Sequence, residues 1–169
     1  MKPRILSAVL PVLLLPGVAM AQTKISGAGR CEKPHAQHSV KVPDSANHTL
    51  GVSQAKCVWT KPWEIEGIKN KEGVATVSED VTGDTARSRE VFVDTMENGD
   101  KAFYRYEATT TLKAGAPQAS QGQWTLTGGT GKLKAIKGKG TCKATAFEPD
   151  GALTFECEGE YTAAAAKKP

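Results

Sequence analysis

Three histidines, His35, His38 and His48, lie within the segment bounded by Cys31 and Cys57. Neutral imidazole is a good ligand for zinc or copper, and three such rings on one constrained loop could leave a coordination position open. The alternative is that they are solvated side chains of a loop whose flanking cysteines are oxidised. We favour this second interpretation, so the sequence predicts no metal site and no cofactor, with the three histidines kept as the weaker hypothesis.

The stretch LTGGTGKLKAIKGKGTCK, residues 126–143, has the composition of a phosphate-binding loop. The stretch does not match a Walker loop, because Leu126 stands where the pattern needs glycine and Leu133 stands where it needs serine or threonine. The dinucleotide pattern fails because Lys134 stands where its third glycine belongs and no strand–helix unit surrounds it. We interpret the stretch as a strand connection in which Thr130 caps a single helical turn and the lysines form a solvated face.

The first 21 residues have the features of a secretory signal peptide. Lys2 and Arg4 precede an apolar run, residues 5–18, that is too short and too interrupted by proline to span a membrane. Residues 19–21 read Ala-Met-Ala and match a cleavage site. We therefore expect a mature chain that begins at Gln22, is periplasmic or secreted, and has no membrane anchor.

Length and charge are typical of a single domain without a nucleic-acid partner. Without the leader, the 169-residue chain is still long enough to bury about 70% of the surface that its unfolded form exposes. Two of its 22 basic residues lie in the leader, so the remainder is nearly balanced against 18 acidic residues. The sequence predicts one domain over residues 22–162 and a disordered tail over residues 163–169, and it leaves the oligomeric state open.

The four cysteines predict two disulfides, because their number is even and an exported protein meets an oxidising environment. Of the three connectivities we favour Cys31–Cys57 and Cys142–Cys157. A turn at Pro-Asp-Gly, residues 149–151, would place the second pair on the inner face of one hairpin if its loop has two or four residues. A three-residue loop with a glycine bulge would place the two sulfurs on opposite faces.

A second hairpin is predicted at Asn98-Gly99, which suits a two-residue type I′ turn. Pairing outward from this turn gives three pairs on one buried face: Thr95 with Ala102, Val93 with Tyr104, and Val91 with Tyr106. Turn residues recur roughly every 8–12 positions, and only the leader keeps a long helical stripe. These patterns predict an all-β fold, a small closed antiparallel barrel of about eight strands, with a β-sandwich as the alternative.

The segment GQWTLTGGTGKLKAIKGKGTCKA, together with the later ECEGEY, is similar to a pattern in small exported bacterial proteins of unknown role. Its Gly-Gly-Thr-Gly-Lys element resembles that of the allene oxide cyclase and dirigent barrels. Those families share an eight-stranded antiparallel β-barrel with an apolar interior, so the resemblance implies a barrel with a cavity. It covers the C-terminal part of the chain alone, and no catalytic residue is carried over.

Six aromatic residues are predicted to point into such a barrel: Trp59, Trp63, Tyr104, Tyr106, Trp124 and Phe155. They could line a cavity for a flat or apolar ligand, although a barrel of eight strands is more often packed solid. No carboxylates pair by spacing into an acid–base dyad, and no catalytic nucleophile is evident, so we lean against an enzyme. The hypothesis is an exported barrel that binds a small apolar molecule. The alternatives are a cavity-based isomerase or cyclase and a structural or interaction protein of the cell envelope.

Overall fold

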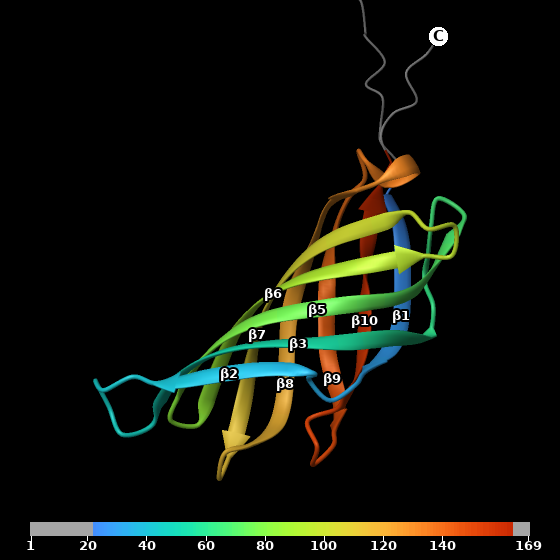
Figure 1. Cartoon of the computed structure of the whole chain (residues 1–169). Helices are drawn as coiled ribbons and strands as arrows, with labels where there is room; N and C mark the ends of the chain where they lie inside the picture. Colours follow the sequence, from blue (N-terminus) through green and yellow to red (C-terminus); the bar gives the residue numbers. More distant parts are fainter. Residues whose placement is uncertain (1–21, 164–169) are drawn as a thin grey trace, which may run out of the picture.

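The computed structural model describes residues 22–163, which form an all-β barrel (Figure 1). Ten strands and one short 3-10 turn follow one another within this range. They are β1 (Gln22–Cys31), β2 (Ala36–Lys41), β3 (His48–Lys61), β4 (Glu64–Ile65), β5 (Ile68–Thr82), β6 (Thr85–Met96), β7 (Lys101–Lys113), β8 (Ala116–Gly129), η1 (Gly131–Leu133), β9 (Lys137–Phe147) and β10 (Leu153–Thr162). The predicted signal peptide and all but the first residue of the predicted tail lie outside the described residues.

Eight of the strands close on themselves. Each pairs in antiparallel orientation with both neighbours in the order β1, β10, β9, β8, β7, β6, β5, β3, and β3 returns to β1. The short strands β2 and β4 are additions to β3 and β5. The predicted closed barrel of about eight strands is therefore confirmed, and the sandwich alternative is wrong.

The solid part of the core fills the end of the barrel near the η1 turn and the two ends of the described chain (Figure 1). Met96, Leu126, Leu133 and Ile136 lie there and are at most 2% exposed. Met96 and Leu126 are buried because every second side chain of a barrel strand points inward, whereas Leu133 ends the η1 turn and Ile136 follows it, so both cover that end of the barrel.

The opposite end of the barrel has two unpaired strand edges. Among the described strands, β2 pairs with β3 alone. β8 pairs with β7 over its full length, but it pairs with β9 only through Gln121–Leu126. The free side of β2 and the first residues of β8 therefore leave backbone groups unpaired at the end far from η1 (Figure 1).

The hairpin between β6 and β7 has a different register from the predicted one. The N–H of Gly99, at φ 84°, donates to the Met96 carbonyl, and the Met96 N–H donates to the Asp100 carbonyl, which defines a three-residue loop. The resulting inner pairs are Asp94 with Ala102, Phe92 with Tyr104, and Glu90 with Tyr106. The predicted inward set of β6 is wrong, since those residues face outward and one of them, Val91, is 44% exposed.

Asp100 explains this register. Its Oδ2 accepts from Asn98 Nδ2 over 2.9 Å and from the Lys132 N–H over 3.3 Å, so it joins the hairpin to the glycine-rich loop. The Thr130 hydroxyl accepts from the Lys101 N–H over 2.8 Å, and it does not cap the η1 turn as predicted. In the loop whose composition resembles a phosphate-binding loop, the Lys132 N–H thus donates to the chain's own Asp100 carboxylate.

Both predicted disulfides are present: Cys31–Cys57 and Cys142–Cys157. Each joins two residues that face each other on neighbouring strands. The β9–β10 hairpin nevertheless has the three-residue loop, with Gly151 at φ 90°, that was expected to separate the second pair. The β9–β10 pairing shifts by one residue between Thr154 and Phe155, and this shift places Cys142 opposite Cys157. The pairing was predicted correctly, but the loop length behind that prediction was not.

Glycines of β9 and β10 make room for Trp124, which is 3% exposed. A Cβ atom added at Gly140 would lie 2.5 Å from the indole, and one added at Gly159 would overlap it. The indole Nε1 donates to the Glu158 carbonyl over 3.2 Å. Close approach of the Trp124 ring therefore accounts for Gly140 on β9 and Gly159 on β10.

We predict that Gly140→Ala lowers the free energy of unfolding by roughly 1–3 kcal/mol, because the new methyl group overpacks the core against Trp124. Gly51→Ala is the matched control, since the nearest atom to its added Cβ is 3.6 Å away. Urea unfolding of both variants measures the difference. Equal stability of the two variants would show that the ring is not held against β9.

We further predict that Gly131→Val destabilises the fold by roughly 2 kcal/mol or more. Gly131 has φ 51°, and an added Cβ would overlap the Asp100 carboxylate. Lys132→Ala should change neither stability nor affinity for ATP, because its exposed side chain holds no phosphate. Thermal unfolding and an ATP titration test both variants, and saturable ATP binding lost in Lys132→Ala would contradict this interpretation.

Candidate functional site

A cavity of about 1350 Å³ lies inside the barrel and touches all eight of its strands. Each strand contributes residues centred on one inward position, and these positions form a continuous row of direct neighbours from Gly27 on β1, by way of β10 to β5, to Gly51 on β3. The row is staggered where the barrel closes, because β1 pairs with β3 near Trp59 and Lys61. We call this row the small-residue layer: Gly27, Gly51, Glu79, Ser88, Ala108, Gly122, Cys142 and Cys157. Seven of its eight members are glycine, alanine, serine or disulfide cysteine, so this row carries little side-chain volume.

The next row of inward positions toward η1 is called the floor layer: Ile25, Ser53, Val77, Glu90, Tyr106, Trp124, Gly140 and Gly159. Glu90 and Tyr106 are direct neighbours in it, on β6 and β7. The Tyr106 hydroxyl donates to the Cys142 carbonyl over 3.3 Å, which orients the phenol toward the small-residue layer. Glu90 and Tyr106 thus occupy the inward positions next to the residues that line the cavity.

Glu90 is the most perturbed carboxyl group near the cavity. Burial raises its pKa to about 7, and no hydrogen bond or nearby cation offsets that effect. Burial also raises the pKa of Glu79 in the small-residue layer. The pKa of Tyr106 is raised by burial first and by the charge of Glu90 second. The interior therefore favours neutral side chains unless something positive enters it.

A second buried carboxyl group, Asp94, lies further toward η1 and is fully buried. Trp59 Nε1 donates to its Oδ1 over 3.0 Å, while burial still raises the pKa of Asp94 to about 7. Within the described residues its other oxygen has no hydrogen-bond partner, and neither do the Asn70 amide and the Tyr104 hydroxyl. Burial, with the charge of Asp94, raises the pKa of Tyr104 well above its ordinary value.

The six aromatic residues singled out from the sequence all converge on the interior. Ring centroids lie 4.7 Å apart for Trp59 and Trp63, 5.4 Å for Trp63 and Trp124, and 5.4 Å for Trp59 and Phe155. Tyr104 and Tyr106 pack into the same cluster, which we call the aromatic plug and which fills the interior next to the cavity. Their role in binding a ligand stays a prediction. The small-residue layer itself went unnoticed, because its glycines are recognisable only once the strands are paired.

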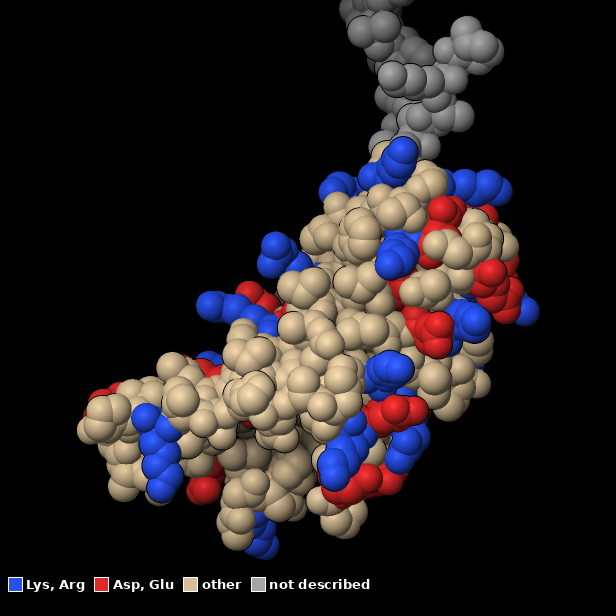
Figure 2. All heavy atoms as spheres, in the orientation of Figure 1, with Lys and Arg blue, Asp and Glu red and all other residues tan. Residues whose placement is uncertain are grey.

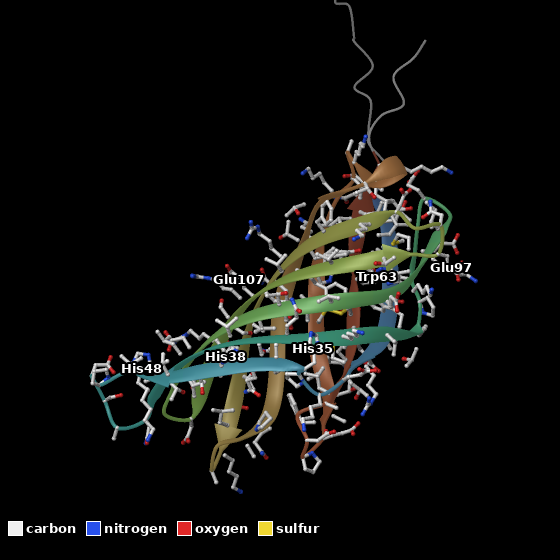
Figure 3. The ribbon with its side chains drawn as sticks, in the orientation of Figure 1. His35, His38, His48, Trp63, Glu97 and Glu107 are labelled. Atoms are coloured by element: carbon white, nitrogen blue, oxygen red, sulfur yellow. A yellow bond between two sulfur atoms is a disulfide. The ribbon has the colours of Figure 1, made fainter. Side chains whose placement is uncertain are left out.

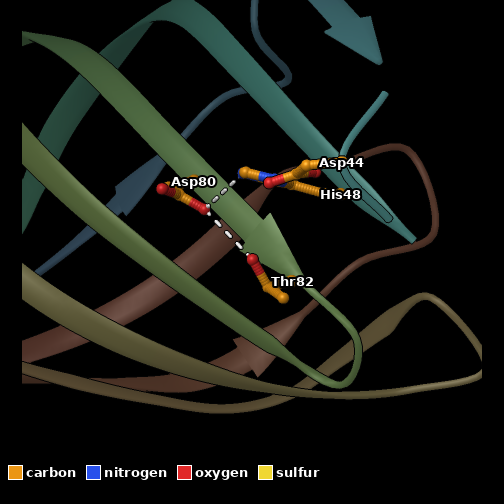
Figure 4. Close-up of polar contacts among 4 residues, drawn as sticks. All are labelled: Asp44, His48, Asp80 and Thr82. Carbon is orange, nitrogen blue, oxygen red and sulfur yellow. Dashed lines mark hydrogen bonds and ion pairs between the residues drawn. The ribbon is translucent and has the colours of Figure 1, made fainter. Parts of the chain in front are cut away.

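The histidines are not brought together (Figure 3). His35 Nε2 lies 3.1 Å from Gln54 Oε1, and His38 is exposed on β2. His48 lies between two carboxylates, 2.7 Å from Asp44 and 3.2 Å from Asp80 (Figure 4). The hydrogen bond with Asp44 raises the pKa of His48. Residues 22–163 contain no group of three His, Cys, Asp or Glu side chains arranged to hold a metal ion.

The outer surface contrasts with the interior. Figure 2 shows Lys and Arg interspersed with Asp and Glu around the edges of one face, and a centre free of charged side chains. Several outward cations lie beside outward carboxylates, as in Arg89 with Glu107 at 3.5 Å and Lys143 with Glu156 at 3.3 Å. In residues 22–163 no helix is long and apolar enough to cross a membrane.

Comparison with known proteins supports the fold alone. No protein-family model matches the sequence, and a search of curated proteins finds no match. Among solved structures, a pterocarpan synthase dirigent protein is similar, with a TM-score of 0.50 and 12% sequence identity over 93% of this chain and 97% of that chain. The fold resembles a dirigent barrel. The predicted resemblance to this barrel type is thus supported in its architecture, and the cavity lies within that architecture.

We predict that Asp94 makes the protein less stable as the pH rises. Because its pKa is raised from 3.8 to about 7, the folded state keeps a proton that the unfolded chain releases. The resulting stability is complete below about pH 4 and is lost as the pH rises through about 7. Between pH 5 and 8 this group should lower the free energy of unfolding by on the order of 3 kcal/mol.

Asp94→Asn should lose that share of the pH dependence, which urea unfolding at pH 5 and pH 8 would measure. Asp84→Asn, in the exposed turn between β5 and β6, should keep the pH dependence of the natural protein. The same pH dependence in Asp94→Asn and in the natural protein would contradict the prediction.

Proposed function

We propose that this protein binds a small organic molecule in the cavity of its barrel. The observation that supports the proposal is the small-residue layer, because glycine, alanine and serine replace the large side chains that normally fill an eight-stranded barrel. A volume of about 1350 Å³ exceeds the roughly 300–1,000 Å³ typical of small-molecule sites. Export to the periplasm or the exterior belongs to this proposal, since two disulfides suit an oxidising compartment.

The ligand should have an apolar body that rests on the aromatic plug. Trp124 and Tyr106 belong to the floor layer and offer large rings with polar edges. The Ser88 hydroxyl of the small-residue layer supplies an additional polar group along the wall. This combination of aromatic floor and few polar groups matches the general composition of a small-molecule site.

A cavity-based isomerase or cyclase is the second candidate, and Glu90 is the observation that favours it. A carboxyl group with a pKa of about 7 can both donate and accept a proton near neutral pH. The similar solved structure is named as a pterocarpan synthase, and its barrel is compatible with either a binding or a cyclase-like role here. Binding is the simpler proposal, because both candidates require it.

Binding can be tested with the neutral fluorescent probe N-phenyl-1-naphthylamine. The natural protein should bind it saturably, and Ala108→Phe should weaken binding at least about tenfold by filling the cavity. Thr111→Phe is the matched control, since this exposed residue of β7 does not line the cavity and its variant should bind normally. Absence of binding, or equal binding by both variants, would favour the envelope structural or interaction protein instead.

A further inference from the structure

The inward side chains of the small-residue layer and the floor layer carry charge of one sign, although the exposed cations Lys61, Arg87, Arg89 and Lys143 also border the cavity. The small-residue layer and the floor layer contain two carboxyl groups, Glu79 and Glu90, and no lysine, arginine or histidine. A third carboxyl group, Asp94, lies four residues beyond Glu90 on β6. On the same strand the cations Arg87 and Arg89 alternate to the outer face. The interior is therefore acidic, although the whole chain is slightly basic.

The two cavity carboxyl groups are close enough to share one ligand group. Glu79 pairs with Ser88 and Val77 pairs with Glu90, which makes Glu79 and Glu90 diagonal neighbours on β5 and β6. Diagonal neighbours have Cα atoms roughly 7–8 Å apart, and two extended glutamate side chains can converge over that distance. They approach the cavity from adjacent layers, one in its wall and one in its floor.

Neither carboxyl group has a partner among the described residues. Glu90 points inward and is partly buried, and burial is the sole cause of its raised pKa, whereas hydrogen bonds or a nearby cation would lower it. The outward carboxylates differ, since Glu107 and Glu156 each have a cation within 3.5 Å. An isolated carboxyl group kept inside a barrel costs stability, and a positive ligand would offset that cost.

The aromatic floor adds a second attraction for positive charge. Tyr106 is the direct neighbour of Glu90, and Trp124 is the direct neighbour of Tyr106. A cation placed beside Glu90 would thus lie near the faces of two aromatic rings, which attract ammonium groups through their quadrupoles. Carboxylate and ring would act on the same ligand group.

We infer that the cavity selects organic cations, that is, molecules with an ammonium group that meets Glu90 and Glu79 and an apolar body that rests on the aromatic floor. This inference rests on the proposed binding function and adds the chemical class of the ligand. An organic cation satisfies at once the space, the unpaired carboxyl groups and the aromatic surface.

The inference has a definite pH dependence. Glu90 is ionised at pH 8 and largely neutral at pH 5.5, because its pKa is about 7. The titratable groups that face it are Tyr106 from β7, Glu79 from β5 and, further along β6, Asp94. Tyr106 stays neutral throughout because its pKa is raised, and Asp94→Asn separates the contribution of Asp94. Cation affinity should therefore rise with pH through about 7.

The experiment compares phenyltrimethylammonium with its neutral isostere tert-butylbenzene, each measured by displacement of N-phenyl-1-naphthylamine. The quaternary cation keeps its charge at every pH, so changes with pH report on the protein. At pH 8 the ratio of cation affinity to isostere affinity should be at least about tenfold higher in the natural protein than in Glu90→Gln. The same ratio should fall at pH 5.5, and Glu79→Gln should lower it less.

Glu97→Gln is the matched control, because this glutamate is exposed in the turn between β6 and β7 and does not line the cavity (Figure 3). It should leave the ratio unchanged. If Glu90→Gln does not fold, the pH series on the natural protein and Glu79→Gln decide the question. A ratio that ignores both pH and these variants while the naphthylamine still binds would overturn the cation inference alone. Failure of every probe to bind would overturn the proposed function with it.

Discussion

The number of strands fixes the width of a barrel, so the size of the inward side chains decides, layer by layer, where the interior is solid and where it is hollow. In this protein the layers near η1 carry tryptophan, tyrosine and phenylalanine, and they are packed. The following layer carries glycine, serine, alanine and disulfide cysteine, and it is hollow. The cavity, its aromatic floor and its unpaired carboxyl groups all follow from this one change in side-chain size.

Glycine has different consequences at different places in the interior. Gly140 and Gly159 lie under the Trp124 ring, so their missing side chains are replaced by an indole. Gly27 of the small-residue layer is also close to a ring, since its added Cβ would lie 3.2 Å from Trp59. The nearest atom to an added Cβ at Gly51 is 3.6 Å away, so no large side chain replaces what is missing there.

Part of this arrangement could be predicted from the sequence, because it depends on local alternation and turn residues. The closed barrel, both disulfides and the inward direction of Tyr104 and Tyr106 are of this kind. The register at Asn98-Gly99 was mispredicted, since it depends on Asp100 contacting Lys132, 32 residues away. The small-residue layer was missed for the same reason, as its members come from eight strands and acquire meaning only through their pairing.

The position of the disulfides reflects the cost of the hollow layer. Side chains that would hold the wall by packing are absent there, so the dispersion contacts across the barrel are lost. Cys142 and Cys157 belong to that layer and join β9 to β10, and Cys31–Cys57 joins β1 to β3 where the barrel closes. A disulfide stabilises by roughly 3 kcal/mol through the unfolded chain, without needing volume in the interior. Covalent bonds across the wall can therefore replace packing through the centre, which lets the barrel keep an open interior.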